Sequence, residues 1–149
     1  MDFPEFYHFA HERCIEFAET DMAGIVHFTN ILRYVEATEH GMLRACGTNA
    51  YKVDDTQHFG WPRIKVSCNY TRPLRFEEKI EVCLHVEETR NCSLRYRFLI
   101  FKEAERSITN LAAEGEITTV YVALDPNTNK LTKMPLPEEM RQALENLRV

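Results

Sequence analysis

A carboxylate, a glycine and a histidine lie close together in the segment ETDMAGIVHFTN, residues 19–30. Asp21 is followed three residues later by Gly24, and glycine allows the backbone to turn sharply. We expect a helix to begin shortly afterwards, and the first N–H groups of a helix have no intrahelical partner and carry partial positive charge. A carboxylate that faces such a terminus suits hydrolysis of an activated acyl group, because the N–H groups hold the oxyanion while the carboxylate attacks or activates water. The residues alone leave another interpretation open, in which Asp21 is a helix cap or turn residue.

A strand and a long helix are expected to position this segment. Residues 13–17, RCIEF, are predicted to form the first strand. Apolar residues recur at three- and four-residue spacing from residue 28 to residue 46, which predicts a largely enclosed helix with Gly47 as its stop signal. Gly41 lies inside this helix at a cost of about 1 kcal/mol relative to alanine, and it indicates a close approach by another backbone.

Further along the chain the apolar period changes to two. Alternation over residues 64–70, 80–87 and 94–101, with a long run over 108–124, predicts antiparallel strands with one covered and one solvated face. Asp125-Pro126-Asn127 is a turn signal, and residues 136–139 are expected to open a short terminal helix. The prediction is an α+β fold in one domain over residues 1–149, with one long helix packed against a single sheet.

Composition excludes several classes of protein. A net charge of −5 provides no basic field for nucleic acid or an anionic membrane surface, and no apolar run approaches the roughly 18 residues of a membrane span. The first residues lack the pattern of a secretory signal. Five cysteines without a C-x-x-C pair argue against a disulfide framework or a zinc site and favour a reducing cytoplasm. The histidines outside the Asp21 segment that we considered show no ligand-like spacing, so no metal is expected; these are His8, His11, His40 and His85.

The stretch IEFAETDMAGIVHFTNILRYVEATEHGMLRACG resembles the signature of the 4-hydroxybenzoyl-CoA thioesterase-like branch of the hotdog superfamily. That signature consists of a strand, Asp-x-x-Gly-(Ile/Val)-Val, an aromatic pair and the long central helix. VSCNYTRPLRFEEKIEV, VEETRNCSLRYRFLIF and ALDPNTNKLTKMPLPEEMRQAL resemble its later segments, so the likeness spans residues 11–145. It implies a hotdog fold, a five-stranded antiparallel sheet wrapped around one long helix, with a short C-terminal helix. It also implies hydrolysis of acyl-CoA to a carboxylic acid and free CoA, without metal or organic cofactor.

The resemblance assigns roles to residues of the Asp21 segment. Asp21 corresponds to the nucleophile or general base, and Gly24 permits the turn. The backbone N–H groups of Val26, His27 and Phe28 correspond to the oxyanion donors. Many relatives have tyrosine at position 27, so the His27 side chain is left with three interpretations: it shapes the acyl pocket, assists proton transfer, or is packed.

Four further residues are candidates for substrate binding. Trp61, in the apolar segment HFGWP, is expected to cover the acyl group, with plain packing as the alternative. Arg90 and Ser93 correspond to a hairpin that touches the nucleotide part of CoA in relatives. Arg72 is a weaker candidate, because a solvated arginine in a turn is the commoner case.

Competing interpretations remain open from the sequence. Glu36 and Glu39 compete with Asp21, because another hotdog branch uses a helical glutamate, although we expect both to face outward or to be loosely paired. A hotdog hydratase or dehydratase, or a non-enzymatic acyl-CoA-binding module, would share this fold. Because a lone sheet leaves an edge strand unpaired, and relatives build their active site at a dimer interface, a homodimer or homotetramer is expected.

Overall fold

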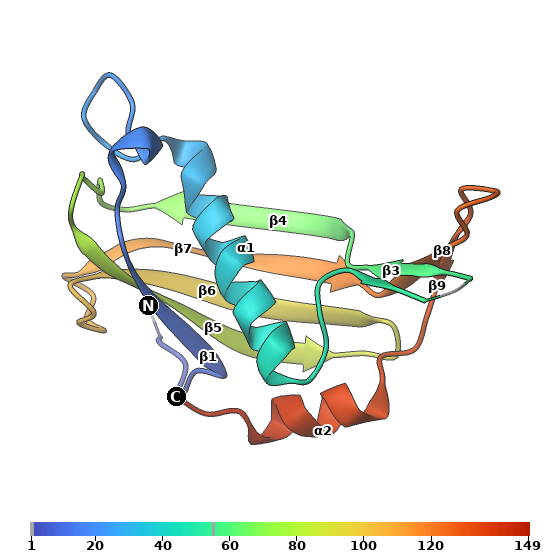
Figure 1. Cartoon of the computed structure of the whole chain (residues 1–149). Helices are drawn as coiled ribbons and strands as arrows, with labels where there is room; N and C mark the ends of the chain where they lie inside the picture. The colour runs from blue at the N-terminus through green and yellow to red at the C-terminus, as the bar shows by residue number, and fades with distance from the viewer. Residues whose placement is uncertain (1, 55) are drawn as a thin grey trace.

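The computed structural model describes residues 2–54 and 56–149, and its main body is one helix against one curved sheet (Figure 1). Helix α1, Phe28–Ala45, crosses the face of a five-stranded antiparallel sheet. This arrangement confirms the predicted α+β hotdog fold. In spatial order the strands are β1 (Phe9–Cys14), β5 (Lys79–Thr89), β6 (Ser93–Lys102), β7 (Leu111–Val120) and β4 (Arg63–Tyr70).

The core lies between α1 and the sheet. Apolar side chains on one side of the helix pack against inward-facing side chains of β5, β6 and β7, as the three- and four-residue spacing predicted. Gly41 does mark a close approach, but by a side chain and not by a backbone: a Cβ at this position would lie 2.7 Å from the Phe9 ring on β1. Just beyond the helix, Gly47 has φ +79°, the left-handed conformation that favours glycine at a helix end.

The first strand lies earlier than predicted. It spans Phe9–Cys14, and residues Phe17–Glu19 form a short 3₁₀ turn, η1. Ile15 is buried in the core, but Phe17 is 73 % exposed and does not continue an inward-facing pattern. The glutamates at both ends of the turn cap it reciprocally: the Glu16 N–H donates to Glu19 Oε1 at 2.7 Å. This local capping ends the strand before the segment that carries Asp21.

The outer face of the sheet is only partly solvated, contrary to the prediction. The N-terminal segment folds back over β5, β6 and β7, and Phe3 meets Phe101 edge-to-face with ring centroids 5.5 Å apart. The uncovered part of this face carries charged side chains: on β6, Arg95 pairs with Glu87 at 3.0 Å and with Glu116 at 3.2 Å. Alternation therefore predicted the two faces correctly but not what covers the outer one. The buried outer cluster comprises Tyr7, Cys83, Leu99, Phe101 and Leu111.

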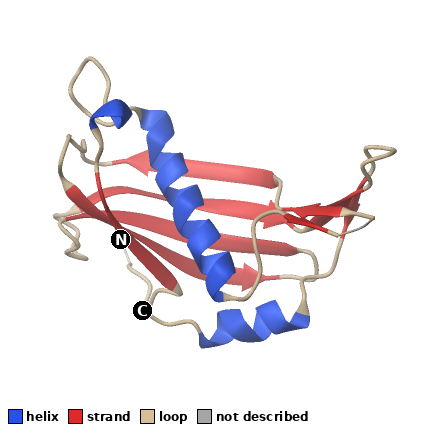
Figure 2. Ribbon diagram, viewed as in Figure 1, coloured by secondary structure: helices blue, strands red, loops and turns tan. Residues whose placement is uncertain are grey.

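A second, smaller sheet was not predicted. Its four strands, in spatial order, are β2 (Lys52–Val53), β3 (His58–Gly60), β8 (Val122–Leu124) and β9 (Leu131–Lys133). The long apolar run is divided at Tyr121, whose N–H donates to Cys92 O at 2.8 Å, so the chain passes from the main sheet into the small one. Figure 2 shows the small sheet extending beyond one end of the main sheet. The predicted terminal helix is α2, Glu138–Asn146, which begins after Pro137.

Candidate active site

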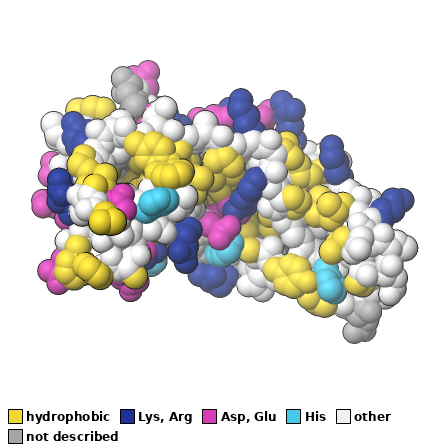
Figure 3. Space-filling view, turned by 90° about the horizontal axis from the view of Figure 1, so that it is seen from above, with side chains coloured by type: hydrophobic (Ala, Val, Ile, Leu, Met, Phe, Trp, Pro, Cys, Tyr) yellow, Lys and Arg dark blue, Asp and Glu magenta, His cyan; other side chains and the backbone are white. Residues whose placement is uncertain are grey.

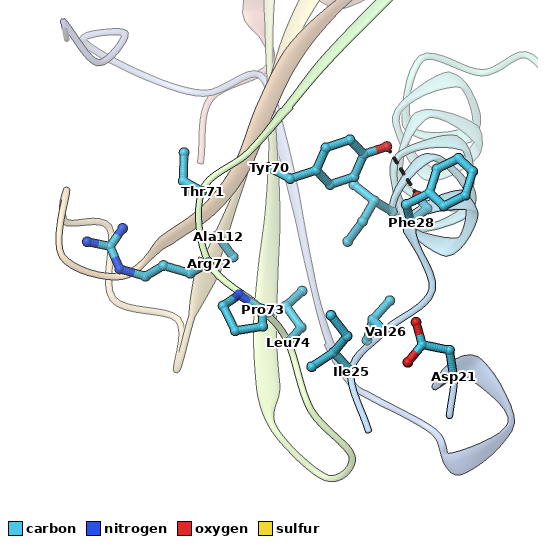
Figure 4. Close-up of a pocket in the computed structure, with 11 residues that line it drawn as sticks. Asp21, Ile25, Val26, Phe28, Tyr70, Thr71, Arg72, Pro73, Leu74 and Ala112 are labelled. Carbon is cyan, nitrogen blue, oxygen red and sulfur yellow. Dashed lines mark hydrogen bonds between the residues drawn. The ribbon is translucent and has the colours of Figure 1, made fainter. Parts of the chain in front are cut away.

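A pocket of about 360 Å³ opens between the Asp21 loop, the start of α1 and the segment that follows β4 (Figure 4). Most of its wall is apolar, and Asp21 contributes a carboxylate. An apolar hollow with few polar groups is the usual form of a small-molecule site. Its lining residues are Asp21, Ile25, Val26, Phe28, Ile31, Tyr70, Thr71, Arg72, Pro73, Leu74 and Ala112.

The Asp21 loop is a closed turn. The Asp21 N–H donates to Ile25 O at 2.8 Å, and the Gly24 N–H donates to Asp21 O at 3.0 Å, with Gly24 at φ +76°. Asp21 Oδ1 accepts the Ala23 N–H at 2.8 Å. Asp21 is exposed, and within the described residues its second carboxylate oxygen accepts no hydrogen bond. Figure 4 shows the carboxylate directed toward Val26 and the helix start. Asp21 therefore stabilises its own turn and retains one free oxygen at the pocket.

The cap of α1 is His27, not Asp21. Its Nδ1 accepts the Thr29 N–H at 3.3 Å and lies 2.7 Å from the Thr29 hydroxyl oxygen. The His27 ring stacks at a tilt against Phe28, with centroids 4.7 Å apart. It does not line the pocket. This geometry supports a capping and packing role among the three interpretations of His27.

The three amides predicted as oxyanion donors differ in availability. The Val26 N–H donates to Leu74 O at 2.8 Å, and the His27 N–H donates to Glu19 O at 3.0 Å. Both are therefore occupied by the fold itself. The N–H of Phe28, the first residue of α1, has no partner among residues 2–54 and 56–149. The expected set of donors is thus reduced to Phe28, at the wall of the same pocket as Asp21.

Tyr70 is a pocket residue that the sequence reasoning missed. Its hydroxyl donates to Phe28 O at 3.3 Å, which links the end of β4 to the first turn of α1 (Figure 4). Desolvation, and after it the contact with Cys68, raises the pKa of Tyr70 to about 12, so the phenol remains protonated at neutral pH. The available signal was an aromatic residue at the end of an alternating strand, directly before the Thr-Arg-Pro turn.

Arg72 lines the pocket with its backbone and stem, but its guanidinium points away from Asp21 (Figure 4). Its Nη1 donates to Ile108 O at 3.1 Å and to Leu111 O at 2.8 Å. Arg72 therefore ties the segment after β4 to the start of β7. This structural use differs from the alternative interpretation, which expected a solvated arginine, because the guanidinium is bound to two backbone carbonyls.

The other candidates lie at the opposite end of the sheet. Trp61 precedes β4 and Tyr70 ends it, and the 8 residues of that strand extend roughly 25 Å. Trp61 is buried against Tyr121, with ring centroids 4.9 Å apart. Arg90 pairs with Glu88 at 2.9 Å, and its N–H donates to Ser93 O at 2.9 Å in the turn between β5 and β6. A single chain does not bring these residues to the Asp21 pocket.

The two helical glutamates differ from each other. Glu36 is exposed and lies 3.7 Å from Arg63. Glu39, which we expected to face outward or to be loosely paired, is instead 2 % exposed and accepts hydrogen bonds from the Tyr96 hydroxyl and, at 2.8 Å, from Arg63 Nη1. Burial and the adjacent Glu39 carboxylate raise the pKa of Tyr96 well above its usual value. Glu39 is thus enclosed, and both of its carboxylate oxygens accept hydrogen bonds. The sequence pattern did not predict this, because both partners come from strands distant in sequence.

In the part of the chain that the structure describes, no group of three or more His, Cys, Asp or Glu side chains could hold a metal ion. Among the same residues, neither helix combines the length and the apolar character needed to cross a membrane.

Comparison with known proteins gives one consistent picture. The family model for the acyl-ACP thioesterase N-terminal domain matches residues 7–144. A 1,4-dihydroxy-2-naphthoyl-CoA hydrolase of Prochlorococcus marinus is 25 % identical over 126 residues, which cover 80 % of this chain and 77 % of that protein. The structure of a gentisyl-coenzyme A thioesterase superposes with a TM-score of 0.74 at 21 % identity, covering 91 % of this chain and 98 % of that one. A 1,4-dihydroxy-2-naphthoyl-CoA thioesterase from Synechocystis gives a TM-score of 0.73 at 20 % identity, covering 93 % and 96 %.

Proposed function

The chain belongs to the acyl-ACP thioesterase family and is a thioester hydrolase, and from that premise we propose that Asp21 carries the hydrolysis of an acyl-CoA. One observation carries the proposal. Asp21, whose second carboxylate oxygen accepts no hydrogen bond from the described residues, and Phe28, whose N–H has no partner among them, line the same apolar pocket. The products are a carboxylic acid and free CoA.

The chemistry follows from this pairing. The thioester oxygen accepts the Phe28 N–H, and the positive end of α1 stabilises the charge that develops on that oxygen. The Asp21 carboxylate then attacks the carbonyl carbon, which breaks the C–S bond and leaves an acyl–aspartyl anhydride for water to hydrolyse. In the other route the same carboxylate takes a proton from water as the water attacks. In both routes the sulfur leaves with the C–S electron pair and is protonated to the thiol of CoA.

The dimensions of the pocket favour a compact acyl group. Its volume of about 360 Å³ is near the lower end for small-molecule sites, and the Phe28 and Tyr70 rings belong to its wall. The two solved structures compared above are named for aromatic acyl-CoA substrates. We therefore place an aromatic acyl group in this pocket, where ring–ring contacts add to apolar burial.

A second copy of the chain is proposed to complete the site. Strand β4 is an edge of the main sheet, and its apolar residues Ile64 and Val66 are 65 % and 42 % exposed. Figure 3 views the molecule from the β4 side and shows hydrophobic side chains spread over this face. Antiparallel pairing of two β4 edges about a two-fold axis would set the Trp61 end of one chain beside the Asp21 end of the other. Such a dimer would let Trp61, Arg90 and Ser93 serve the site of the partner copy.

The test is release of free thiol from a panel of acyl-CoAs with aromatic, short and long acyl groups, for wild type and Asp21→Asn. We expect turnover of aromatic acyl-CoA to fall about 10³-fold in the variant, with substrate affinity retained. Asp125→Asn is the matched control, because Asp125 Oδ1 likewise accepts the N–H two residues further on, that of Asn127 at 2.8 Å, and Asp125 does not line the pocket. Equal turnover in wild type and Asp21→Asn would remove Asp21 from the mechanism.

A further inference from the structure

The backbone carbonyl of Glu19 connects the loop that carries Asp21 to the start of α1. This oxygen accepts the His27 N–H at 3.0 Å and the Asn30 side-chain Nδ2 at 2.8 Å. Asn30 is the third residue of α1, and it is 8 % exposed. A buried amide that binds a backbone carbonyl across eleven residues of sequence restricts both segments.

Glu19 is held from its other side as well. Its carboxylate accepts Arg13 Nη2 at 2.9 Å, and the Arg13 guanidinium lies 4.2 Å from the centroid of the fully buried Tyr34 ring. The Glu16 N–H donates to the second carboxylate oxygen at 2.7 Å. Strand β1, η1 and α1 therefore all meet at Glu19, which makes this residue a fixed point.

Between that fixed point and the helix, the chain forms a short closed loop. Thr20 and Val26 form an isolated antiparallel bridge, and the Asp21 N–H donates to Ile25 O at 2.8 Å. Any shift of Glu19 relative to the first turn of α1 would move the whole loop. The distance from the Asp21 carboxylate to the Phe28 N–H would change with it.

We propose that Asn30 is a positioning residue: through its hydrogen bond to the Glu19 carbonyl, it holds the Asp21 carboxylate at a fixed position relative to the Phe28 N–H. This inference rests on the role proposed above for Asp21. Asn30 does not line the pocket, so it acts without touching the substrate. Small errors of position matter, because a displacement of about 1 Å in a catalytic group lowers the rate roughly 100-fold.

The test is Asn30→Leu, which keeps the approximate volume and removes the donor. The Glu19 carbonyl keeps its hydrogen bond from the His27 N–H, so it is not left unsatisfied. We expect kcat for the best acyl-CoA of the panel to fall about 10- to 100-fold, with KM changed by less than about threefold. In the Asp21→Asn background the same substitution should lower the residual turnover no further, because the group that it positions is already absent.

Thr38→Val is the matched control. Thr38 lies on the same helix, is buried, and donates its hydroxyl to Tyr34 O at 2.8 Å. It should lower stability and leave kcat unchanged. Asn30→Asp, which keeps the side-chain shape and loses the amide donor, takes the place of Asn30→Leu if that variant does not fold.

Three results would overturn the proposal: an unchanged kcat, a rise in KM alone, or an equal further loss in the Asp21→Asn background. A fully active Asp21→Asn variant would instead refute the proposed function, so the two failures are distinguishable.

Discussion

Two carboxylates that lie toward opposite ends of the main sheet, Asp21 and Glu39, differ in their exposure and in their hydrogen bonding. At one end Asp21 is exposed and lines an apolar pocket. One of its carboxylate oxygens accepts a hydrogen bond within its own turn, and the other accepts none from the described residues. Toward the other end Glu39 is buried, and both of its oxygens are bound by Tyr96 and Arg63. A free carboxylate at a pocket can react, whereas a buried and fully bound one holds elements together. The difference lies in the partners that the fold brings to each carboxylate. The sequence around Glu39 predicts a helix, and its two partners come from distant strands.

The two ends of the sheet also differ in which candidate site residues they contain. The Asp21 end has a pocket, a free amide and a carboxylate, while Trp61 and Arg90 lie at the far end of the same sheet. If two β4 edges pair, each Asp21 pocket gains the far end of a partner copy. Breaking that edge therefore tests whether one chain is sufficient.

After Asp21→Asn, the largest effect is expected from Ile64→Lys, at the exposed edge of β4. A lysine there opposes pairing of the edge with a second copy, because its charge would be desolvated in the interface. We expect a monomer in analytical ultracentrifugation and turnover lower by about 100-fold or more. The matched control is Ile108→Lys, since Ile108 is 55 % exposed but lies outside β4. A fully active Ile64→Lys monomer would show that one chain carries a complete site.

The next largest effect is expected on stability, from replacement of Glu39, whose two carboxylate oxygens both accept hydrogen bonds. Glu39→Ala leaves the Arg63 guanidinium and the Tyr96 hydroxyl without their shared partner. Removal of one partner of a buried ion pair costs about 3–5 kcal/mol, and we expect roughly 2–3 kcal/mol because Arg63 is partly exposed. Urea denaturation measures this loss, and Glu36→Ala, at the exposed neighbour, should change stability by less than about 0.5 kcal/mol. Glu39 would become the competing catalytic acid if Glu39→Ala lost turnover while the free energy of unfolding stayed the same.

Local patterns predicted helix α1, the later strands of the main sheet and the turn at Asp21, because each of these depends on neighbours in sequence. The period of two marked the strands, the period near 3.6 marked α1, and Asp21 with Gly24 marked the turn. The burial of Glu39 was beyond such patterns, since Arg63 and Tyr96 reach it from β4 and β6.

The predictions that remain untested also depend on contacts between residues that are distant in sequence or belong to another chain. Whether Trp61 and Arg90 act on a substrate depends on a partner surface, which periodicity does not encode. The covering of the outer face by Phe3 and Tyr7 was missed for the same reason, because alternation distinguishes two faces without identifying what packs on them.

A pH effect is expected near the far end of the sheet. His8 is 7 % exposed, and its Nδ1 accepts the Val86 N–H at 3.0 Å. Burial, and after it the nearby His85 and Arg148, lowers the pKa of His8 to about 4. The unfolded chain therefore binds a proton at higher pH than the folded one, so stability falls as pH drops from about 6.5 toward 4.

His8→Gln should reduce this fall in stability, by about 2 kcal/mol between pH 7 and pH 4. Urea denaturation of both proteins across this range gives the difference. Turnover at pH 7 should be the same for both, because His8 does not line the Asp21 pocket. Parallel stability curves for wild type and His8→Gln would show that His8 is not the titrating group.

The smallest effect is expected from Arg90→Ala, and it tests whether the far end meets the nucleotide of CoA. Among the described residues the Arg90 side chain is paired only with Glu88, which is half-buried, and the Arg90 side chain is 71 % exposed, so its loss should leave the fold intact. We expect KM for acyl-CoA to rise roughly fivefold, which corresponds to about 1 kcal/mol for a solvent-exposed charge contact. KM for the corresponding acyl-N-acetylcysteamine should not change, because that thioester lacks the nucleotide. Arg95→Ala, which removes a neighbouring arginine held by Glu87 and Glu116, is the control and should affect neither KM. An equal rise for both substrates would mean that Arg90 acts through the structure of the hairpin and not through the phosphates.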